Sequence, residues 1–307
     1  MKEILIFGHK NPDTDSICAA MVKQILNEKD GKDNSQAVRL GNINKETEFV
    51  LNYLGLEAPE LIETVEPGQK VIMVDHNEFN QSVSGIEEAK ILGVVDHHRI
   101  SNFQTAEPLY YTARPYGCTC TILYKDFVQK GITIDKKEAI LMASAIISDT
   151  LLLKSPTTTK HDEEAVKALA EIAGIDYNTY GLDMLKAGTD LSSFSIEEIL
   201  SLDAKRIDLK EVKSIIAQVN TASIEDVMTM EADLKEKMQE KIAAEGLDLF
   251  MFLVTDIVNS NSQVIALGNS ANVVEKAYGV TLENDSALLK GVVSRKKQVV
   301  PIMTENA

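Results

Sequence analysis

Three short apolar runs early in the chain are each closely followed by histidine or aspartate. They span residues 4–7, 71–74 and 91–95, and helical patterns lie between them. Strands that alternate with helices are typical of α/β folds with a parallel sheet and right-handed crossovers. Ligands of such sheets bind at the carboxyl ends of the strands, which is where these polar residues fall. We therefore expect an N-terminal α/β domain with a parallel sheet flanked by helices.

The loop after the first run reads Gly-His-Lys-Asn-Pro-Asp-Thr-Asp-Ser and covers residues 8–16. Glycine and proline end the strand, and helical periodicity resumes over residues 15–27, with Thr14 or Asp15 as the expected N-cap. Asp13 and Asp15 are two residues apart, so in an extended loop their side chains can face different ways. The pattern therefore predicts a loop that serves two neighbouring cations.

The sequence pattern changes near residues 185–193, which are mostly small and polar. We expect one domain over residues 1–187, a linker over 188–194 and a second domain over 195–307. The C-terminal part predicts a smaller α/β domain with a mixed sheet. Its expected elements are a strand at 213–219, a helix at 230–245 and a hairpin formed by 249–258 and 263–267.

Composition limits the classes of partner. The 307-residue chain has 47 acidic and 31 basic residues, a formal net charge of −16. Such a surface repels nucleic acid and anionic lipid, so we expect neither as a partner, and a small anionic substrate would need metal ions and a few placed cationic side chains. No apolar run reaches the roughly 18 residues of a membrane span, and no leader pattern opens the sequence. We expect a cytoplasmic protein, and the three cysteines, an odd number, fit a reducing compartment.

Six side chains in the first half of the chain are candidate metal ligands. They are His9, Asp13, Asp15, Asp75, His97 and Asp149. Carboxylates and imidazoles without thiolates favour Mn²⁺, Co²⁺ or Fe²⁺ over a structural zinc. Six ligands are too many for one ion that keeps open positions, so we expect two ions with Asp75 as the bridging carboxylate. Two ions about 3.5–4 Å apart can turn a shared water into a bridging hydroxide at neutral pH and polarise a phosphoryl oxygen.

Ordinary structural roles remain open for several residues. An aspartate after a strand is often only a helix N-cap, which applies above all to Asp15. His76 either orients a metal ligand or fills the core as a satisfied histidine. Arg295, Lys296 and Lys297 can be a solvated basic surface, although a chain this acidic favours an anion site there. Lys205 is typical of a surface helix residue.

Several motifs together carry a family resemblance. Residues 8–16, Val74-Asp75-His76-Asn77, Asp96-His97-His98 and Ser148-Asp149-Thr150 resemble the Asp-His-His phosphoesterase superfamily. With Ser294-Arg295-Lys296-Lys297-Gln298, the chain resembles family II inorganic pyrophosphatase, the manganese- or cobalt-dependent soluble type of bacteria, over nearly its whole length. The resemblance implies hydrolysis of pyrophosphate to two phosphates, two Mn²⁺ or Co²⁺ per subunit, and a homodimer joined through the N-terminal domain. It also implies that residues 1–187 form a metal-binding domain and residues 195–307 a substrate-binding domain, with the active site between the two domains.

The resemblance also implies a role for each site residue. One metal is held by His9, Asp13 and Asp75, and the other by Asp15, Asp75, His97 and Asp149. The pyrophosphate oxygens are bound by His98, Lys205, Arg295 and Lys296.

These assignments agree with elementary chemistry. His98, next to a ligand, is expected to donate a hydrogen bond or proton to the leaving phosphate, so His98 and Asp75 are the expected catalytic residues. Arg295 can fork two oxygens, whereas Lys205 and Lys296 act as point charges. An additional Mg²⁺ is expected to arrive with the substrate.

Two other classes of function stay open. One is a nuclease or oligonucleotide phosphodiesterase of the same superfamily, and the other is a phosphate or nucleotide sensor without catalysis. The first is disfavoured because the chain lacks the glycine-rich motif ending in histidine that the resemblance leads one to expect in such nucleases. The chain also has no tryptophan and no basic groove with interleaved aromatic residues.

Overall fold

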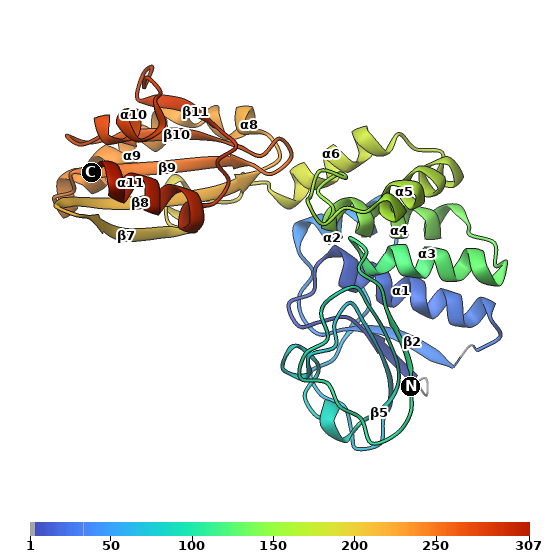
Figure 1. Ribbon diagram of the computed structural model, residues 1–307. Helices are drawn as coiled ribbons and strands as arrows, with labels where there is room; N and C mark the ends of the chain where they lie inside the picture. The colour runs from blue at the N-terminus through green and yellow to red at the C-terminus, as the bar shows by residue number, and fades with distance from the viewer. Residues whose placement is uncertain (1–3, 33) are drawn as a thin grey trace. The chain divides into compact units, whose positions relative to one another are not determined.

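The computed structural model describes residues 4–32 and 34–307 and separates the chain into two compact units, Met1–Gly188 and Thr189–Ala307. Each unit has its own sheet and its own apolar cores (Figure 1). Helix α6 (Tyr177–Gly188) ends where the first unit ends, and helix α7 (Ile196–Ile199) opens the second. None of the helices in the described part of the chain combines the length and the apolar character that crossing a membrane requires.

The first unit is built on a parallel six-stranded sheet with strand order β3-β2-β1-β4-β5-β6. Its strands are β1 (Ile4–Phe7), β2 (Ser35–Arg39), β3 (Glu60–Leu61), β4 (Lys70–Val74), β5 (Lys90–Asp96) and β6 (Tyr110–Ala113). The helices before α6 are α1 (Thr14–Lys29), α2 (Lys45–Leu54), α3 (Thr119–Lys130), α4 (Lys136–Asp149) and α5 (Lys160–Ala173). The prediction of a parallel α/β sheet is confirmed.

The two faces of this sheet are covered differently. Ile6, Val74 and Val95 face a core made with helices α1 to α6, which lie together on one side of the sheet (Figure 1). Leu5 and Phe7, the neighbours of Ile6 in β1, belong to a second core, because successive strand residues point to opposite faces. That second core is closed by loops and by two short 3₁₀ helices, η1 (Phe79–Gln81) and η2 (Ile86–Glu88).

Strand β6 was not anticipated. Residues 101–117 contain two prolines and predict an irregular connector, yet residues 110–113 pair in parallel with β5. An edge strand tolerates nearby prolines because only one of its sides takes part in the ladder. The prediction of an irregular connector was therefore wrong over residues 110–113.

The second unit contains a mixed five-stranded sheet with strand order β11-β10-β9-β8-β7. Strands β8 and β9 are parallel, whereas the other neighbours are antiparallel. Its elements after α7 are β7 (Ala204–Leu209), β8 (Val212–Thr221), α8 (Ile224–Met228), α9 (Glu231–Glu245), β9 (Leu249–Asp256), β10 (Asn261–Leu267), α10 (Asn272–Tyr278), β11 (Ser286–Lys290), the π-helical turn η3 (Arg295–Val299) and α11 (Val300–Asn306). The predicted mixed sheet, long helix and hairpin are all present.

Strand β9 forms the centre of this unit and is buried along its whole length. Phe250 and Phe252 pack with α9 on one face of the sheet, and Leu249 and Met251 pack with α10 and α11 on the other. The unit thus has helices on both faces, in contrast to the first unit.

Candidate active site

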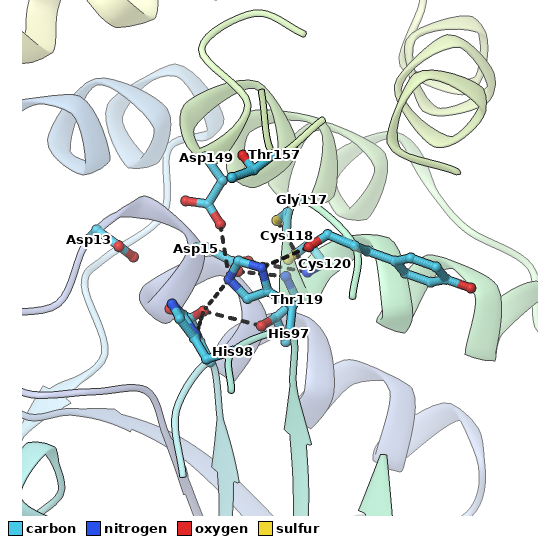
Figure 2. Close-up of polar contacts among 12 residues, drawn as sticks. Asp13, Asp15, His97, His98, Gly117, Cys118, Thr119, Cys120, Asp149 and Thr157 are labelled. Atoms are coloured by element: carbon cyan, nitrogen blue, oxygen red, sulfur yellow. Dashed lines mark hydrogen bonds and ion pairs between the residues drawn. The ribbon is translucent and has the colours of Figure 1, made fainter. Parts of the chain in front are cut away.

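The six candidate metal ligands come together where β1, β4 and β5 end and where α4 ends. They form two groups that share Asp75: His9, Asp13 and Asp75 in the first, and Asp15, Asp75, His97 and Asp149 in the second. Within each group the ligand atoms all lie within 4.8 Å of one another. Figure 2 shows Asp15, His97 and Asp149 of the second group facing one another.

The turn from β1 into α1 depends on Gly8 and Asp13. A Cβ on Gly8 would lie 2.5 Å from the Cβ of Ser16, so only glycine lets the strand end pass this close to the helix. The carboxylate of Asp13 accepts a hydrogen bond from the Ser16 amide at 2.9 Å and caps α1. The prediction of Thr14 or Asp15 as the N-cap was therefore wrong. Capping by Asp13 turns Asp15 inwards, into the second group.

Asp75 lies between the groups and presents one oxygen to each. Its Oδ2 accepts from the Ser16 hydroxyl at 2.7 Å and lies 3.5 Å from Nε2 of His9. Its Oδ1 accepts from the Thr119 hydroxyl at 3.1 Å and lies 3.3 Å from Nε2 of His97. The residue is buried and has a φ of 60°, a left-handed conformation that aspartate adopts more readily than most non-glycine residues.

The two histidine rings are oriented as in metal sites. Nδ1 of His9 lies 2.7 Å from the carbonyl oxygen of Lys10, and Nδ1 of His97 lies 3.0 Å from that of Tyr116. A carbonyl only accepts, so Nδ1 carries the hydrogen and Nε2 is directed at the carboxylates. This arrangement fixes the tautomer that a metal ligand needs.

The carboxylates of the second group are crowded. Asp15 is fully buried and accepts from the amides of Thr119 at 2.7 Å and Cys120 at 3.2 Å, at the start of α3. Burial, and next the charge of Asp75, raises the pKa of Asp15 to about 7. Burial, followed by the charges of Asp15 and Asp75, raises the pKa of Asp149 well above its ordinary range. Such a cluster lacks positive charge, which divalent cations would supply.

The histidines partly offset this excess of negative charge. Burial lowers the pKa of His9, but the carboxylates of Asp13 and Asp75 outweigh that effect and raise it to about 9. Burial opposes protonation of His97 as well, but the hydrogen bond with Asp75 and the charge of Asp15 raise its pKa to about 9. In the metal-free protein, protons therefore occupy positions that cations would otherwise fill.

Oxygen and imidazole donors make up both groups, which fits manganese or cobalt as expected from the sequence. Cys118 and Cys120 also lie near Asp15, but burial raises the pKa of the Cys118 thiol well above its ordinary range and that of Cys120 to about 12. The Cys118 sulfur instead accepts from the Cys120 amide at 3.3 Å at the start of α3. Both thiols therefore pack at the start of α3 and are not among the expected metal ligands.

His98 is held by a carboxylate that sequence reasoning did not single out. Oδ1 of the buried Asp96 accepts from the His98 amide and lies 3.0 Å from Nδ1 of the ring. Asn77 donates to Oδ2 of Asp96 at 2.6 Å and holds it in turn. The hydrogen bond with Asp96 raises the pKa of His98 despite partial burial, so the half-exposed ring is suited to donate a proton. The adjacency of Asp96 to the histidine pair was the available signal.

His76 has the surroundings of a core histidine. It is buried, its Nδ1 donates to the carbonyl of Val74 at 2.9 Å, and burial lowers its pKa to about 4. Within the described residues, its Nε2 has no hydrogen-bond partner. His76 is therefore a buried histidine with one nitrogen unsatisfied in the part of the chain that the structure describes, and not the satisfied core histidine that the sequence allowed.

Three of the four candidate anion-binding residues, Lys205, Arg295 and Lys296, lie in the second unit, whereas His98 lies in the first. Lys205 is exposed in edge strand β7, not in a helix as its surroundings in sequence predicted, and it pairs with Ile216 of β8. Arg295 opens η3, and its guanidinium lies 3.4 Å from the Ile216 carbonyl. Lys296 follows Arg295 and is exposed. Lys205 and Arg295 thus contact the same position of β8.

The Arg295 guanidinium is not fully open to a ligand. Its Nη2 lies 2.7 Å from Oδ1 of Asp203, and its Nη1 donates to the Asp203 carbonyl. The main-chain amide of Arg295 donates to the Gln218 side chain at 3.1 Å. The sequence predicts a forked contact with substrate but does not reveal that this carboxylate already holds one edge of the fork.

Stability of the metal-free protein is expected to fall as pH rises. The raised pKa values of His9, His97 and Asp15 mean that the folded state binds more protons than the unfolded chain. The stabilisation is complete at pH values below the pKa that each group has in the unfolded chain. It is lost as the pH rises through the pKa values of the folded state, about 7 to 9. We expect the midpoint of thermal unfolding in chelator to drop by several degrees, roughly 2–4 °C per kcal/mol, between pH 6.5 and 9.

Calorimetry of the metal-free protein across this pH range checks the prediction, and Mn²⁺ should raise the midpoint more at pH 8.5 than at pH 6.5. An unfolding midpoint that rose with pH in chelator would contradict the conclusion that the folded state binds more protons than the unfolded chain.

Two family models match the chain, the N-terminal domain of the DHH family over residues 3–146 and the DHHA2 domain over residues 182–306. With the shared-aspartate cluster at the strand ends, they define a two-domain α/β protein of the DHH type. The chain is 55% identical over 306 residues to the manganese-dependent inorganic pyrophosphatase of Bacillus subtilis, with 99% of each chain covered. The chain therefore belongs to the family II inorganic pyrophosphatases, which confirms the resemblance seen in its motifs.

Solved structures agree. A protein of Methanococcus jannaschii classed with the family II inorganic pyrophosphatases matches at a TM-score of 0.64 with 40% identity, covering 99% of both chains. An exopolyphosphatase-related protein of Bacteroides fragilis matches at a TM-score of 0.52 with 11% identity, over 99% of this chain and 91% of that one. The latter likeness shows the fold alone.

Proposed function

We propose that this chain hydrolyses inorganic pyrophosphate to two orthophosphates with two manganese ions per subunit. The observation that carries the proposal is the pair of ligand groups that share Asp75. One carboxylate oxygen of Asp75 faces the first group, and the other oxygen faces the second group. Full-length identity of 55% to a manganese-dependent inorganic pyrophosphatase supports the substrate and the metal. We assign metal binding to residues 1–187 and substrate binding to residues 195–307, joined by a linker at 188–194.

Each group of residues has a separate task in this proposal. Bound manganese supplies Lewis acidity, which polarises phosphoryl oxygens and makes a nucleophile available at neutral pH. Asp75, held by Ser16 and Thr119, keeps the two ion positions at a fixed separation. Asp96 orients the His98 ring, whose raised pKa lets it donate a proton or hydrogen bond to the leaving phosphate.

The cationic side chains of the second unit bind the rest of the substrate charge in this proposal. Arg295 and Lys296 follow Ser294, which caps the π-helical turn by accepting from the Lys297 amide at 3.2 Å. Lys205 adds a point charge. An additional Mg²⁺ that arrives with pyrophosphate would neutralise part of the remaining charge.

Phosphate release in Mn²⁺ from pyrophosphate and from short oligonucleotides tests this function. We expect release from pyrophosphate and none from the oligonucleotides. Release only from oligonucleotides would favour a nuclease, and pyrophosphate binding without turnover would favour a sensor. A net charge of −16 supports the expectation that nucleic acid is not a partner. Three free, buried cysteines support a reducing compartment, and we propose the cytoplasm.

We also propose that the chain forms a homodimer through edge strand β6. The strand pairs with β5 on one side, and Tyr110 at its start is 88% exposed, a surface that a second copy would cover.

Light scattering after size-exclusion chromatography should give twice the 33.8 kDa chain mass, and Tyr110→Glu should shift the measured mass towards that of the monomer. Val128→Glu, at an apolar residue that is 59% exposed on α3, is the control and should leave the mass unchanged. A dimer unaffected by Tyr110→Glu would place the interface elsewhere.

A further inference from the structure

A carboxylate outside both ligand groups connects two of the segments that supply them. Glu46 lies in the first turn of α2, and its side chain is largely withdrawn from solvent. Its Oε1 atom accepts from the Thr14 hydroxyl at 2.6 Å and also from the Ser148 hydroxyl. One oxygen of α2 therefore joins the first residue of α1 to the last turn of α4.

The two hydroxyls occupy sensitive positions. Thr14 stands between Asp13 and Asp15, and Ser148 directly precedes Asp149. Thr14 is fully buried, and its other side-chain contact is with the Thr47 hydroxyl of α2 at 3.2 Å. A shift of either hydroxyl would move a neighbouring ligand, so the shared oxygen sets how far the α1 ligands lie from Asp149.

This contact is not the only one that holds α1 against α4. Helices α1 and α4 already pack through a continuous apolar core that includes Cys18, Ala19 and Leu141. Burial raises the pKa of Glu46 although the two hydroxyls oppose the rise, so a carboxylate is an energetically unfavourable way to hold these helices together. The side chain is also confined, since a Cβ on Gly188 would lie 2.9 Å from its Cβ.

We propose that Glu46 is a positioning residue that sets manganese affinity, chiefly at the group formed by Asp15, Asp75, His97 and Asp149. Two of those four ligands, Asp15 and Asp149, adjoin the hydroxyls that Glu46 holds, whereas the first group receives only Asp13 from the same segments. The inference rests on the proposed two-metal function and concerns the geometry of its ligands.

Two substitutions separate position from charge. Glu46→Gln keeps a carbonyl oxygen that can accept from both hydroxyls, so we expect near wild-type manganese affinity. Glu46→Ala removes the acceptor, and we expect one of the two ions to bind about 10-fold more weakly. This is the lower end of the range for direct partners of metal ligands, because Glu46 contacts the neighbours of the ligands. The control is Glu48→Ala, which removes the same charge from an exposed glutamate in the same turn of the helix. It should leave the manganese affinity unchanged.

Isothermal titration with Mn²⁺ and the Mn²⁺ electron paramagnetic resonance spectrum provide the readouts, neither of which depends on turnover. Combining Glu46→Ala with Ser148→Ala should cost little more affinity than Glu46→Ala alone, since both break the same contact. Wild-type affinity for both ions in Glu46→Ala, or an equal loss in Glu46→Gln, would overturn the inference. If the wild-type protein binds two ions without hydrolysing pyrophosphate, the proposed function fails while the positioning role is still measured.

Discussion

Replacing Asp75 by asparagine is expected to abolish tight binding of both ions and to reduce pyrophosphate hydrolysis about a thousandfold or more. Each carboxylate oxygen of Asp75 faces one ligand group, so its loss affects both sites at once. Ions that stabilise transition-state charge contribute several kcal/mol, and about 4 kcal/mol corresponds to a thousandfold in rate. Metal content after gel filtration, together with the rate of phosphate release, measures both effects.

The matched control is Asp183→Asn, which removes an exposed carboxylate from α6 of the same unit. It should retain wild-type metal content and rate. Asp75→Ala tests the same residue without a hydrogen-bonding substitute. A variant at Asp75 that kept two ions and full turnover would refute the bridging assignment.

Replacing Arg295 by alanine is expected to reduce kcat/KM for pyrophosphate about 10- to 100-fold while bound manganese stays at the wild-type level. Charge-assisted hydrogen bonds are worth about 1.5–3 kcal/mol each, which gives this range. Asp203 holds the Nη1 and Nη2 end of the guanidinium, whereas no partner for Nε appears within the described residues. That edge remains for a phosphate oxygen.

Lys297→Ala is the control for Arg295→Ala. It also removes one positive charge, from an exposed side chain two residues further along the chain. A general electrostatic effect would lower kcat/KM equally in both variants, whereas a placed contact affects Arg295 far more. Loss of manganese from Arg295→Ala, or an unchanged kcat/KM, would contradict a substrate-binding role.

The sequence was informative wherever a chemical group and a strand end coincide. The apolar runs before His9, Asp75 and His97 predict a parallel sheet, and parallel strands necessarily bring their carboxyl ends to one edge. Spacing within the first loop also predicts that Asp13 and Asp15 face different ways, and the structure places them in different groups of candidate ligands.

Contacts between residues distant in sequence left no such signal. Thr119 donates to Asp75 across 44 positions, and Ser148 to Glu46 across 102, and nothing in local spacing marks either hydroxyl. A threonine at a helix start and a serine in a last turn are common in any helical protein. Only the fold shows that the Thr119 hydroxyl holds the ligand Asp75 and that the Ser148 hydroxyl holds Glu46.

Edge strands of the second unit were also hard to foresee. Strand β7 reads Ala-Lys-Arg-Ile-Asp-Leu, and its charged residues suggest a surface helix. Its position at the sheet edge explains the charges, because edge strands carry lysine and arginine that discourage pairing with other chains. Tertiary position therefore overrode local propensity at Lys205.

Titration of the metal-free protein with Mn²⁺, with bound manganese per chain and phosphate release measured in the same samples, tests the central claim most directly. Two ligand groups joined by Asp75 predict little turnover up to one ion per chain and a steep rise to a plateau at two. Full turnover with one ion per chain, or none with two, would contradict a two-metal pyrophosphatase.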